Sequence, residues 1–318
     1  MNFSMHIAII SEEYERGIPD GGLRNARDGL RELLPEARFF VLGGRRYPRG
    51  LWGSWRAALK AENFDARGFD LVITLGAGFA SGVITQPFAR HAAFFFARPP
   101  LGRAPGLAGH WYRLWRPQMS ERVDRWVANS RFVAEALEKD FRVDASVVYP
   151  CSSSFGSRAG IPSAERNQGE PGSVLIAEAS DANVRRVCRA ACERLRVTPI
   201  FAGEASAHEP ADRRALLRRA LFTLVPEAVS FSPWIPEAFA AGRPVLCYRS
   251  AGLPELVEEG ATGLFFDDLH PGVMADGMRR MRGRLDMFNQ GALRARAEKF
   301  SGERFKAEFL KIIENVVQ

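Results

Sequence analysis

The sequence predicts an α/β protein made of two Rossmann-like, doubly wound domains. Short apolar runs alternate with helical stretches, a polar Ser-, Gly- and Pro-rich segment at 151–172 interrupts the alternation, and the same pattern then resumes. Short apolar runs separated by helices are typical of parallel sheets covered on both faces. We expect domains at 1–150 and 151–300 that face a shared cleft, and a C-terminal helix at 301–318 that packs back on the first domain.

In the first half, predicted strands alternate with helices or loops from the opening residues onward. Each apolar run is too short for a buried helix, and most are separated by helical or loop material. Expected strands lie within 5–11, 37–44, 69–78, 91–97, 122–130 and 145–150, and expected helices within 23–34 and 131–141.

The second half shows the same alternation of predicted strands and helices after the polar segment. Expected strands lie within 173–179, 198–204, 222–227, 243–250 and 263–268, and expected helices within 185–195, 211–221, 235–242 and 303–317. The last helix has amphipathic spacing, with apolar residues at Phe305, Phe309 and Ile313.

Composition limits the class of protein. With 318 residues, 46% of them hydrophobic, the chain can bury the cores of two domains. No run of about eighteen apolar residues is present, and the start MNFSMHIAII lacks the features of a signal peptide. We expect a cytoplasmic protein, either free or bound peripherally to the inner face of the membrane.

The four cysteines predict buried, reduced thiols and no metal site. Cys151, Cys188, Cys192 and Cys247 show neither CxxC spacing nor histidines at metal-ligand intervals. Cys188 and Cys192 lie one helical turn apart and fit the small residues of a packed face.

The net charge of +7 favours an anionic partner. A nucleotide diphosphate, an acidic membrane and nucleic acid all fit the charge, as does a merely solvated basic surface. Because the chain has neither a recognition-helix pattern nor an aromatic RNA-binding motif, we expect no nucleic-acid partner.

The segment from Val225 to Asp267 carries the most specific signal. PEAFAAGRPVL, AGLPELV and EEGATGLFF follow one another there, and in this order they resemble the donor-site motifs of family 4 glycosyltransferases of the GT-B fold. The resemblance implies a GT-B protein of the bacterial cell-surface polysaccharide type. It also implies a nucleotide diphosphate sugar as donor, retaining transfer of a hexose, and no metal or other cofactor.

The resemblance implies that several residues of this segment bind the donor. The Glu237 carboxylate can accept hydrogen bonds from the two ribose hydroxyls, although an acidic first-turn residue also complements a helix dipole. The small residues before the next helix let backbone N–H groups approach a diphosphate, although Gly252 also fits a plain tight turn. The implied donor-binding residues are Glu237, Ser232, Phe231, Ala251, Gly252 and Leu253.

The first half adds weaker matches. Gly21 and Gly22 resemble the family's glycine-rich first loop near the acceptor and the donor phosphates. Arg98 stands where the family has a His-x-Pro segment and is a candidate phosphate contact. Ser130 fits the N-cap of the helix that begins at Arg131. An inverting reaction would need a general base, for which the first loop offers three carboxylates, Asp20, Glu12 and Glu13.

Departures from the family pattern fall on the expected catalytic positions. Val229 replaces the first glutamate of E-x7-E, and Glu227 lies two residues away. Glu178 and Asn183 replace the Arg/Lys clamp on the diphosphate, whose loss costs about 3–4 kcal/mol of transition-state stabilisation per donor. Arg185, Arg186 and Glu227 are therefore the candidate catalytic residues.

Four tryptophans lie in two basic segments. Trp52 and Trp55 belong to RGLWGSWRAALK, and Trp111 and Trp115 belong to GLAGHWYRLWRPQ. Aromatic anchors among cations suit a helix on an anionic membrane surface; core helices with snorkelling arginines are the alternative.

Two functions fit these observations. The first is transfer of a hexose from a nucleotide sugar to a glycan or lipid-linked acceptor in surface polysaccharide synthesis. The second is a catalytically degenerate GT-B protein that binds or regulates another glycosyltransferase, which Val229, Glu178 and Asn183 favour.

Overall fold

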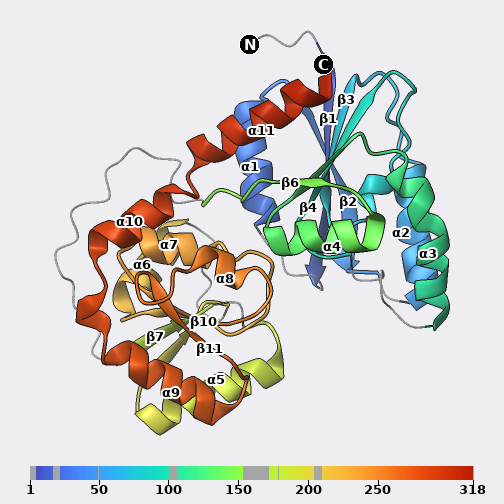
Figure 1. Cartoon of the computed structure of the whole chain (residues 1–318). Coiled ribbons are helices and arrows are strands. Elements are labelled where there is room, and N and C mark those ends of the chain that lie inside the picture. Colours follow the sequence, from blue (N-terminus) through green and yellow to red (C-terminus); the bar gives the residue numbers. More distant parts are fainter. Residues whose placement is uncertain are drawn as a thin grey trace. The chain divides into compact units, whose positions relative to one another are not determined.

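The chain folds into two compact units, each with its own parallel sheet (Figure 1). The computed structural model describes residues 5–16, 22–48, 50–99, 106–152, 172–177, 179–203 and 210–317. Unit 1 comprises Met1–Pro150 and Phe305–Gln318, and unit 2 comprises Cys151–Arg304. The predicted α/β class with two doubly wound sheets is confirmed.

Unit 1 holds a six-stranded sheet in the order β2-β1-β3-β4-β5-β6. Every pairing is parallel, and Ile9 of the central β1 pairs with Phe39 on one side and Ile73 on the other. The strands are β1 (Ile7–Arg16), β2 (Arg38–Arg46), β3 (Leu71–Gly76), β4 (Arg90–Phe95), β5 (Arg125–Ala128) and β6 (Ala145–Val147). Because β2 and β3 lie on opposite sides of β1, the strand order reverses between β1 and β3, which is where open α/β sheets bind ligands.

Helices cover the sheet of unit 1. They are α1 (Leu23–Leu33), α2 (Gly50–Glu62), the 3-10 turn η1 (Ala80–Gly82), α3 (Gly106–Ser120), α4 (Arg131–Phe141) and α11 (Gly302–Val317). Ser130 caps α4, since its side chain accepts a hydrogen bond from the Val133 amide at 3.3 Å. From Phe305 onward α11 belongs to unit 1, where Phe305 and Phe309 pack on Phe94 with ring centroids 6.5 and 5.7 Å away.

Unit 2 holds a five-stranded parallel sheet in the order β11-β10-β9-β7-β8. The strands are β7 (Ser173–Ile176), β8 (Thr198–Phe201), β9 (Thr223–Val225), β10 (Val245–Tyr248) and β11 (Gly263–Phe266). The strand order here reverses between β7 and β9, so the loops that follow these two strands lie at the position where open α/β sheets bind ligands.

The helices of unit 2 pack on both faces of its sheet. They are α5 (Ala182–Leu195), α6 (Pro210–Arg219), α7 (Trp234–Ala240), α8 (Leu253–Leu256), α9 (Pro271–Arg282), the 3-10 turn η3 (Leu285–Met287) and α10 (Gln290–Glu298). Cys188 and Cys192 lie fully buried on α5, and burial raises the pKa of each thiol to about 12. The thiols therefore act as small packing groups.

No helix in the described part of the chain has the length and apolar character needed to cross a membrane.

A buried histidine makes the stability of unit 1 depend on pH. His91 in β4 shares a hydrogen bond with the Thr74 hydroxyl at 3.0 Å and lies 3.0 Å from the Arg122 carbonyl oxygen. Burial lowers the pKa of His91 to about 4, whereas an unfolded histidine titrates near pH ~6.5. Between these values the unfolded chain binds a proton that the folded chain does not, so the free energy of unfolding falls as the pH falls.

We expect His91 to lower the free energy of unfolding by about 3 kcal/mol between neutral pH and its folded pKa. Urea unfolding of the wild type and of His91→Gln, followed across this pH range, measures the difference. The wild type should lose more stability than the variant on acidification. Equal pH slopes for the two proteins would contradict this role for His91.

Candidate functional site

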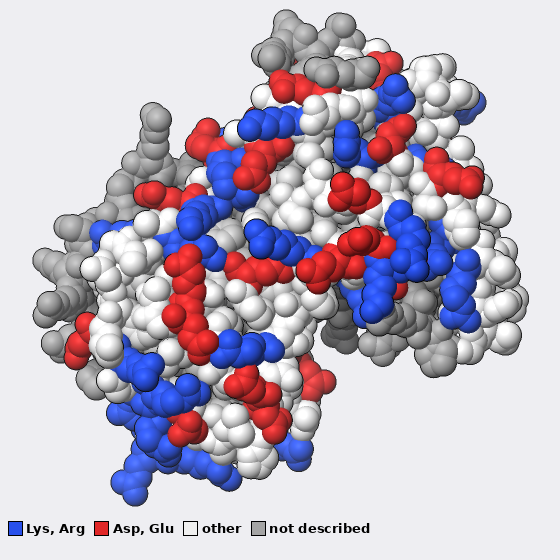
Figure 2. All heavy atoms as spheres, in the orientation of Figure 1, with Lys and Arg blue, Asp and Glu red and all other residues white. Residues whose placement is uncertain are grey.

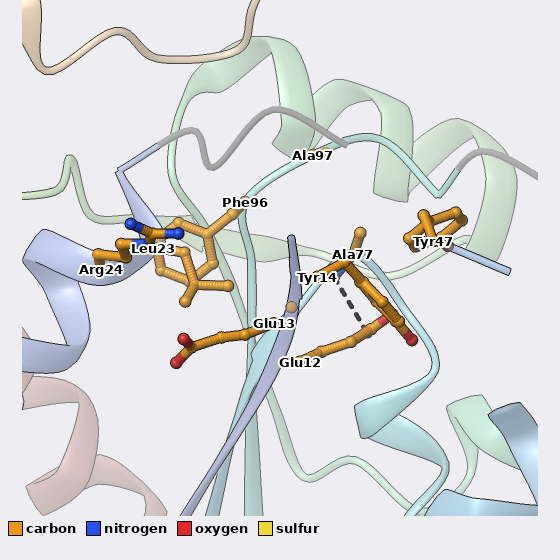
Figure 3. A pocket seen from close by; sticks show the side chains of 10 residues that line it. Glu12, Glu13, Tyr14, Leu23, Arg24, Tyr47, Ala77, Phe96 and Ala97 are labelled. Carbon is orange, nitrogen blue, oxygen red and sulfur yellow. Dashed lines mark hydrogen bonds between the residues drawn. The ribbon is translucent and has the colours of Figure 1, made fainter. Parts of the chain in front are cut away.

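The crevice at the β1–β3 switch point of unit 1 contains two pockets that share Glu12 and Tyr14. The α1-side pocket, shown in Figure 3, is lined by Glu12, Glu13, Tyr14, Leu23, Arg24, Tyr47, Gly76, Ala77, Phe96 and Ala97. The α2-side pocket has a volume of about 580 Å³ and is lined by Glu12, Tyr14, Leu42, Gly43, Gly44, Pro48, Gly53, Arg56, Ala57, Lys60, Ala61, Phe79 and Ala80.

Glu12 joins β1 to the loop after β3, at the level where β3 ends. Its Oε2 atom accepts hydrogen bonds from the four consecutive amides of Ala77–Ala80, at 3.0 to 3.2 Å. A Cβ atom on Gly76 would lie 2.5 Å from that oxygen, so the close approach needs glycine. Glu12 is only 5% exposed, and among the described residues its other oxygen, Oε1, is buried without a well-formed hydrogen bond.

Burial dominates the electrostatics around Glu12. It raises the pKa of Glu12, while the four amide donors act in the opposite direction. Burial, followed by the neighbouring Glu12 carboxylate, also raises the pKa values of Tyr14 and Tyr47, so both phenols stay protonated at neutral pH. The site thus combines one buried carboxyl group with neutral phenols.

Glu13 has a different role because it points to the opposite side of β1 (Figure 3). Its carboxylate forms an ion pair with Arg27 of α1 and accepts a hydrogen bond from the Ser11 hydroxyl at 2.8 Å. Glu13 therefore holds α1 against the sheet.

The other unit 1 residues predicted for the site are dispersed. Gly21 and Asp20 lie outside the described residues. Gly22 stands at the start of α1 with φ 88°, a left-handed conformation that favours glycine. Arg98 lies 3.5 Å from the buried carboxylate of Asp140 in α4, an ion pair within unit 1.

In unit 2 the structure brings Glu227 and Arg185 to the same loop at the switch point. Glu227, after β9, accepts hydrogen bonds from the Ser180 hydroxyl at 3.0 Å and from the Asp181 amide at 2.8 Å. Arg185 donates to the carbonyls of Ala179 and Ser180 at 3.0 and 2.9 Å. Both candidate catalytic side chains thus bind the loop that follows β7.

Asn183, at a clamp position, contacts Arg186 within α5. Arg186 donates to the Asn183 side chain at 2.6 Å, one turn earlier on α5. Glu178 lies outside the described residues.

Glu237 is buried in α7, with an arginine against it. Its side chain is 1% exposed, and Oε1 accepts a hydrogen bond from Arg213 of α6 at 3.1 Å. The Arg213 guanidinium also lies over the Trp234 ring, 5.1 Å from its centroid. Arg213 carries no signal of this role in the sequence, because nothing in ADRRALLRRAL distinguishes it from the neighbouring arginines.

The loops after β9 and β10 pack tightly together. The Gly252 amide donates to the Val229 carbonyl at 3.2 Å, and a Cβ atom on Gly252 would lie 1.9 Å from the Ser230 carbonyl oxygen. Ala251 adopts a left-handed φ of 52°, whereas Leu253, Phe231 and Ser232 are fully buried. The implied donor-binding residues of these two loops are therefore brought together beside α7.

No group of three or more His, Cys, Asp or Glu residues that could hold a metal ion occurs in the described ranges.

Comparisons with known proteins identify the fold. A glycosyltransferase from Rickettsia africae is 14% identical, with a TM-score of 0.67 over 99% of this chain and 100% of that one. HepE from Anabaena, in complex with UDP, is 12% identical, with a TM-score of 0.66 over 98% and 100%. The lipopolysaccharide outer core galactosyltransferase WaaB is 13% identical, with a TM-score of 0.61 over 98% and 99%. The expected GT-B fold is confirmed.

No family model matches the chain. No curated protein matches it either.

The contact between Gly252 and Ser230 can be tested by adding one methyl group. Gly252→Ala places a Cβ atom against a backbone carbonyl that cannot move independently, so we expect a loss of about 1–3 kcal/mol in the free energy of unfolding. Gly203→Ala in the same unit is the matched control, since an added Cβ there has no neighbour within 4 Å. Thermal unfolding of both variants measures the difference, and equal melting temperatures would contradict the close packing of the two loops.

Proposed function

We propose that this protein is a glycosyltransferase that moves a hexose from a nucleotide diphosphate sugar to a glycan or lipid-linked acceptor. One observation carries the proposal: the buried Glu237 carboxylate lies beside two loops, 229–232 and 251–253, that pack against each other in the order of the donor-site motifs. The GT-B fold supports it, as does HepE, a structural neighbour that holds UDP.

Each donor-side residue has a role in this proposal. Glu237 accepts hydrogen bonds from the ribose hydroxyls in place of the one it accepts from Arg213, and Arg213 then offers its charge to the diphosphate. The small loop residues Ala251 and Gly252 let backbone amides approach the same phosphates. Transfer with retention of configuration, without a metal, follows from the resemblance to family 4 glycosyltransferases.

The β7–β9 loop cluster is the proposed catalytic element. Arg185 and Glu227 hold the segment 179–181 from two sides, and Arg186 stands on the adjoining turn of α5. In this proposal Arg185 or Arg186 stabilises the charge of the departing nucleotide, which is the role of the missing clamp.

A second candidate function has its own support. Val229 is an apolar, 3% exposed residue at the first glutamate position, and the Arg185 guanidinium is engaged by loop carbonyls. These features favour a GT-B protein that binds a nucleotide without transferring the sugar and serves another glycosyltransferase as partner or regulator.

The acceptor is proposed to reach unit 1 from an anionic membrane surface on the cytoplasmic side. Trp52 and Trp55 of α2 are 73% and 42% exposed, and Leu107 and Leu114 of α3 are 74% and 64% exposed. Trp115, in contrast, is buried and donates to Glu62 at 2.9 Å. The segment of α2 thus exposes its tryptophan rings, whereas the segment of α3 exposes leucines and buries Trp115.

The charge of this surface suits anionic lipids. The sequences of α2 and α3 contain four cations, Arg56, Lys60, Arg113 and Arg116, and a single acid, Glu62, which pairs with Arg122 at 3.0 Å. On the face seen in Figure 2, the flank where α2 and α3 lie carries uncharged surface bordered by blue side chains. Exposed tryptophans beside basic side chains are typical of interfacial helices.

Nucleotide binding tests the donor site. A nucleotide at a hundred times its dissociation constant should add about 2.7 kcal/mol of stability, a shift of several degrees in Tm. We expect UDP or another nucleoside diphosphate to produce this shift in the wild type and not in Glu237→Gln, because the amide replaces one ribose-binding oxygen with a donor. Thermal-shift measurements with GDP, UDP, ADP, CMP and dTDP compounds and their sugars check this.

Glu193→Gln, an exposed carboxylate on α5 of the same unit, is the control and should keep the shift. If no nucleotide stabilises the wild type, the donor-site proposal is contradicted. A shift without sugar transfer to glycan or lipid-linked acceptors would favour the partner or regulator instead.

Membrane binding is tested by vesicle flotation. We expect the protein to float with vesicles that contain phosphatidylglycerol and to remain unbound with phosphatidylcholine alone, with weaker binding in high salt. Trp52→Ala/Trp55→Ala should weaken binding about tenfold or more, because two apolar anchors are lost. Phe88→Ala removes an equally exposed ring, 71% exposed, outside α2 and α3; an equal loss in this control would contradict the proposed surface.

A further inference from the structure

The α2-side pocket of unit 1 has no role in the donor-side proposal, yet it has the dimensions of a ligand site. Its volume of about 580 Å³ falls in the usual range for small-molecule pockets. It lies at the carboxyl ends of β1 and β2, beside the β1–β3 switch point where doubly wound sheets bind ligands.

Glu12 supplies an unused buried acceptor in this pocket. Four amide donors converge on Oε2, while Oε1 makes no hydrogen bond of good geometry within the described part of the chain. The Tyr14 hydroxyl is a neighbouring donor to this carboxyl group. A buried acceptor without a well-formed hydrogen bond costs about 1–3 kcal/mol. A ligand hydroxyl that donates to Oε1 would remove this cost, so the pocket favours a ligand rich in O–H groups.

Aromatic rings stand next to that acceptor. Tyr14 and Phe79 both line the pocket. Tyr47, which lines the α1-side pocket, packs on both, with ring centroids 5.1 Å from Tyr14 and 5.8 Å from Phe79. Rings beside a hydroxyl-binding group suit a sugar, which has C–H faces as well as hydroxyls.

Cations stand on the α2 side of the same pocket. Arg56 and Lys60 are four residues apart and so lie on one face of α2. Lys60 donates to the Gly43 carbonyl at 3.0 Å, and Arg56 forms no ion pair with any described residue. A guanidinium and an ammonium at this spacing suit a phosphate group.

We propose that the α2-side pocket binds a phosphorylated sugar, with a ring hydroxyl on Oε1 of Glu12 and the phosphate at Arg56 and Lys60. The inference rests on the proposed glycosyltransferase function, in which this ligand is the acceptor. Trp52 and Trp55 precede Arg56 on the same helix and are exposed, so the phosphate of a lipid-linked sugar would stay near the membrane surface.

Binding of defined probes tests the pocket. The probes are the 1-phosphates of glucose, galactose and N-acetylglucosamine, the corresponding methyl glycosides, inorganic phosphate and UDP-glucose, measured by ligand-observed NMR on the full chain. We expect a sugar phosphate to bind more tightly than its methyl glycoside or phosphate alone. Glu12→Gln should weaken both sugar phosphate and glycoside about tenfold, whereas Arg56→Ala should weaken only the sugar phosphate by about this factor.

Controls separate this site from structural damage and from the donor site. Lys139→Ala removes an exposed cation from α4 and should bind like the wild type. Arg56→Ala alters an exposed side chain, so the test remains decisive if Glu12→Gln unfolds. Retention of the nucleotide thermal shift in both pocket variants would show that the donor site is intact.

The sources of the phosphate are distinguished by competition. Displacement of the sugar phosphate by UDP-glucose, lost in Arg56→Ala, would identify the donor's sugar and phosphates as the occupant. Displacement by a polyprenyl phosphate sugar in vesicles, but not by UDP-glucose, would identify a lipid-linked acceptor. The proposal is overturned if none of the sugar phosphates binds the wild type, or if Glu12→Gln and Arg56→Ala bind them unchanged.

Discussion

The hydrogen bonds between Glu12 and the amides of Ala77–Ala80 organise the functional edge of unit 1. A single oxygen holds four consecutive backbone donors after β3 and so ties this loop to β1, across the point where the strand order reverses. The contact is feasible only because Gly76 leaves room for the side chain. The shape of both neighbouring pockets depends on it, since Glu12 lines each of them.

Unit 2 has a similar contact at its own switch point, where a glutamate side chain accepts hydrogen bonds from the neighbouring loop. Glu227 of the β9 loop accepts hydrogen bonds from the β7 loop at Ser180 and Asp181. In a doubly wound sheet the two loops at the switch point diverge and leave a crevice. In both units a carboxyl group at the switch point accepts hydrogen bonds from the loop that follows the neighbouring strand.

The sequence predicted the elements better than their contacts. Hydrophobic runs located all the strands of both sheets to within a few residues, because burial on both faces leaves a local signal. β1 is an exception: it continues to Arg16, well beyond the apolar run, since its polar end pairs with β2 as far as Arg46. The donor motifs likewise indicated the loops at 229–232 and 251–253, which do pack together.

The contacts that form the candidate site could not be predicted from the sequence, because they join residues far apart along the chain. Glu12 meets its amide partners 65 to 68 positions later, and Arg213 meets Glu237 from an arginine-rich helix in which no spacing singles it out. The tryptophans show the same limit: their segments are alike in composition, but Trp52 is 73% exposed and Trp115 only 7%. Which ring turns outward depends on how α2 and α3 pack, and no local pattern encodes that.

The proposed donor site depends most directly on what Glu237 binds. A crystal structure of the protein with UDP would show it. We expect the ribose hydroxyls within hydrogen-bond distance of the Glu237 carboxylate, with Arg213 moved from its present position toward the diphosphate. UDP bound elsewhere, with the hydrogen bond from Arg213 to Glu237 intact, would contradict it.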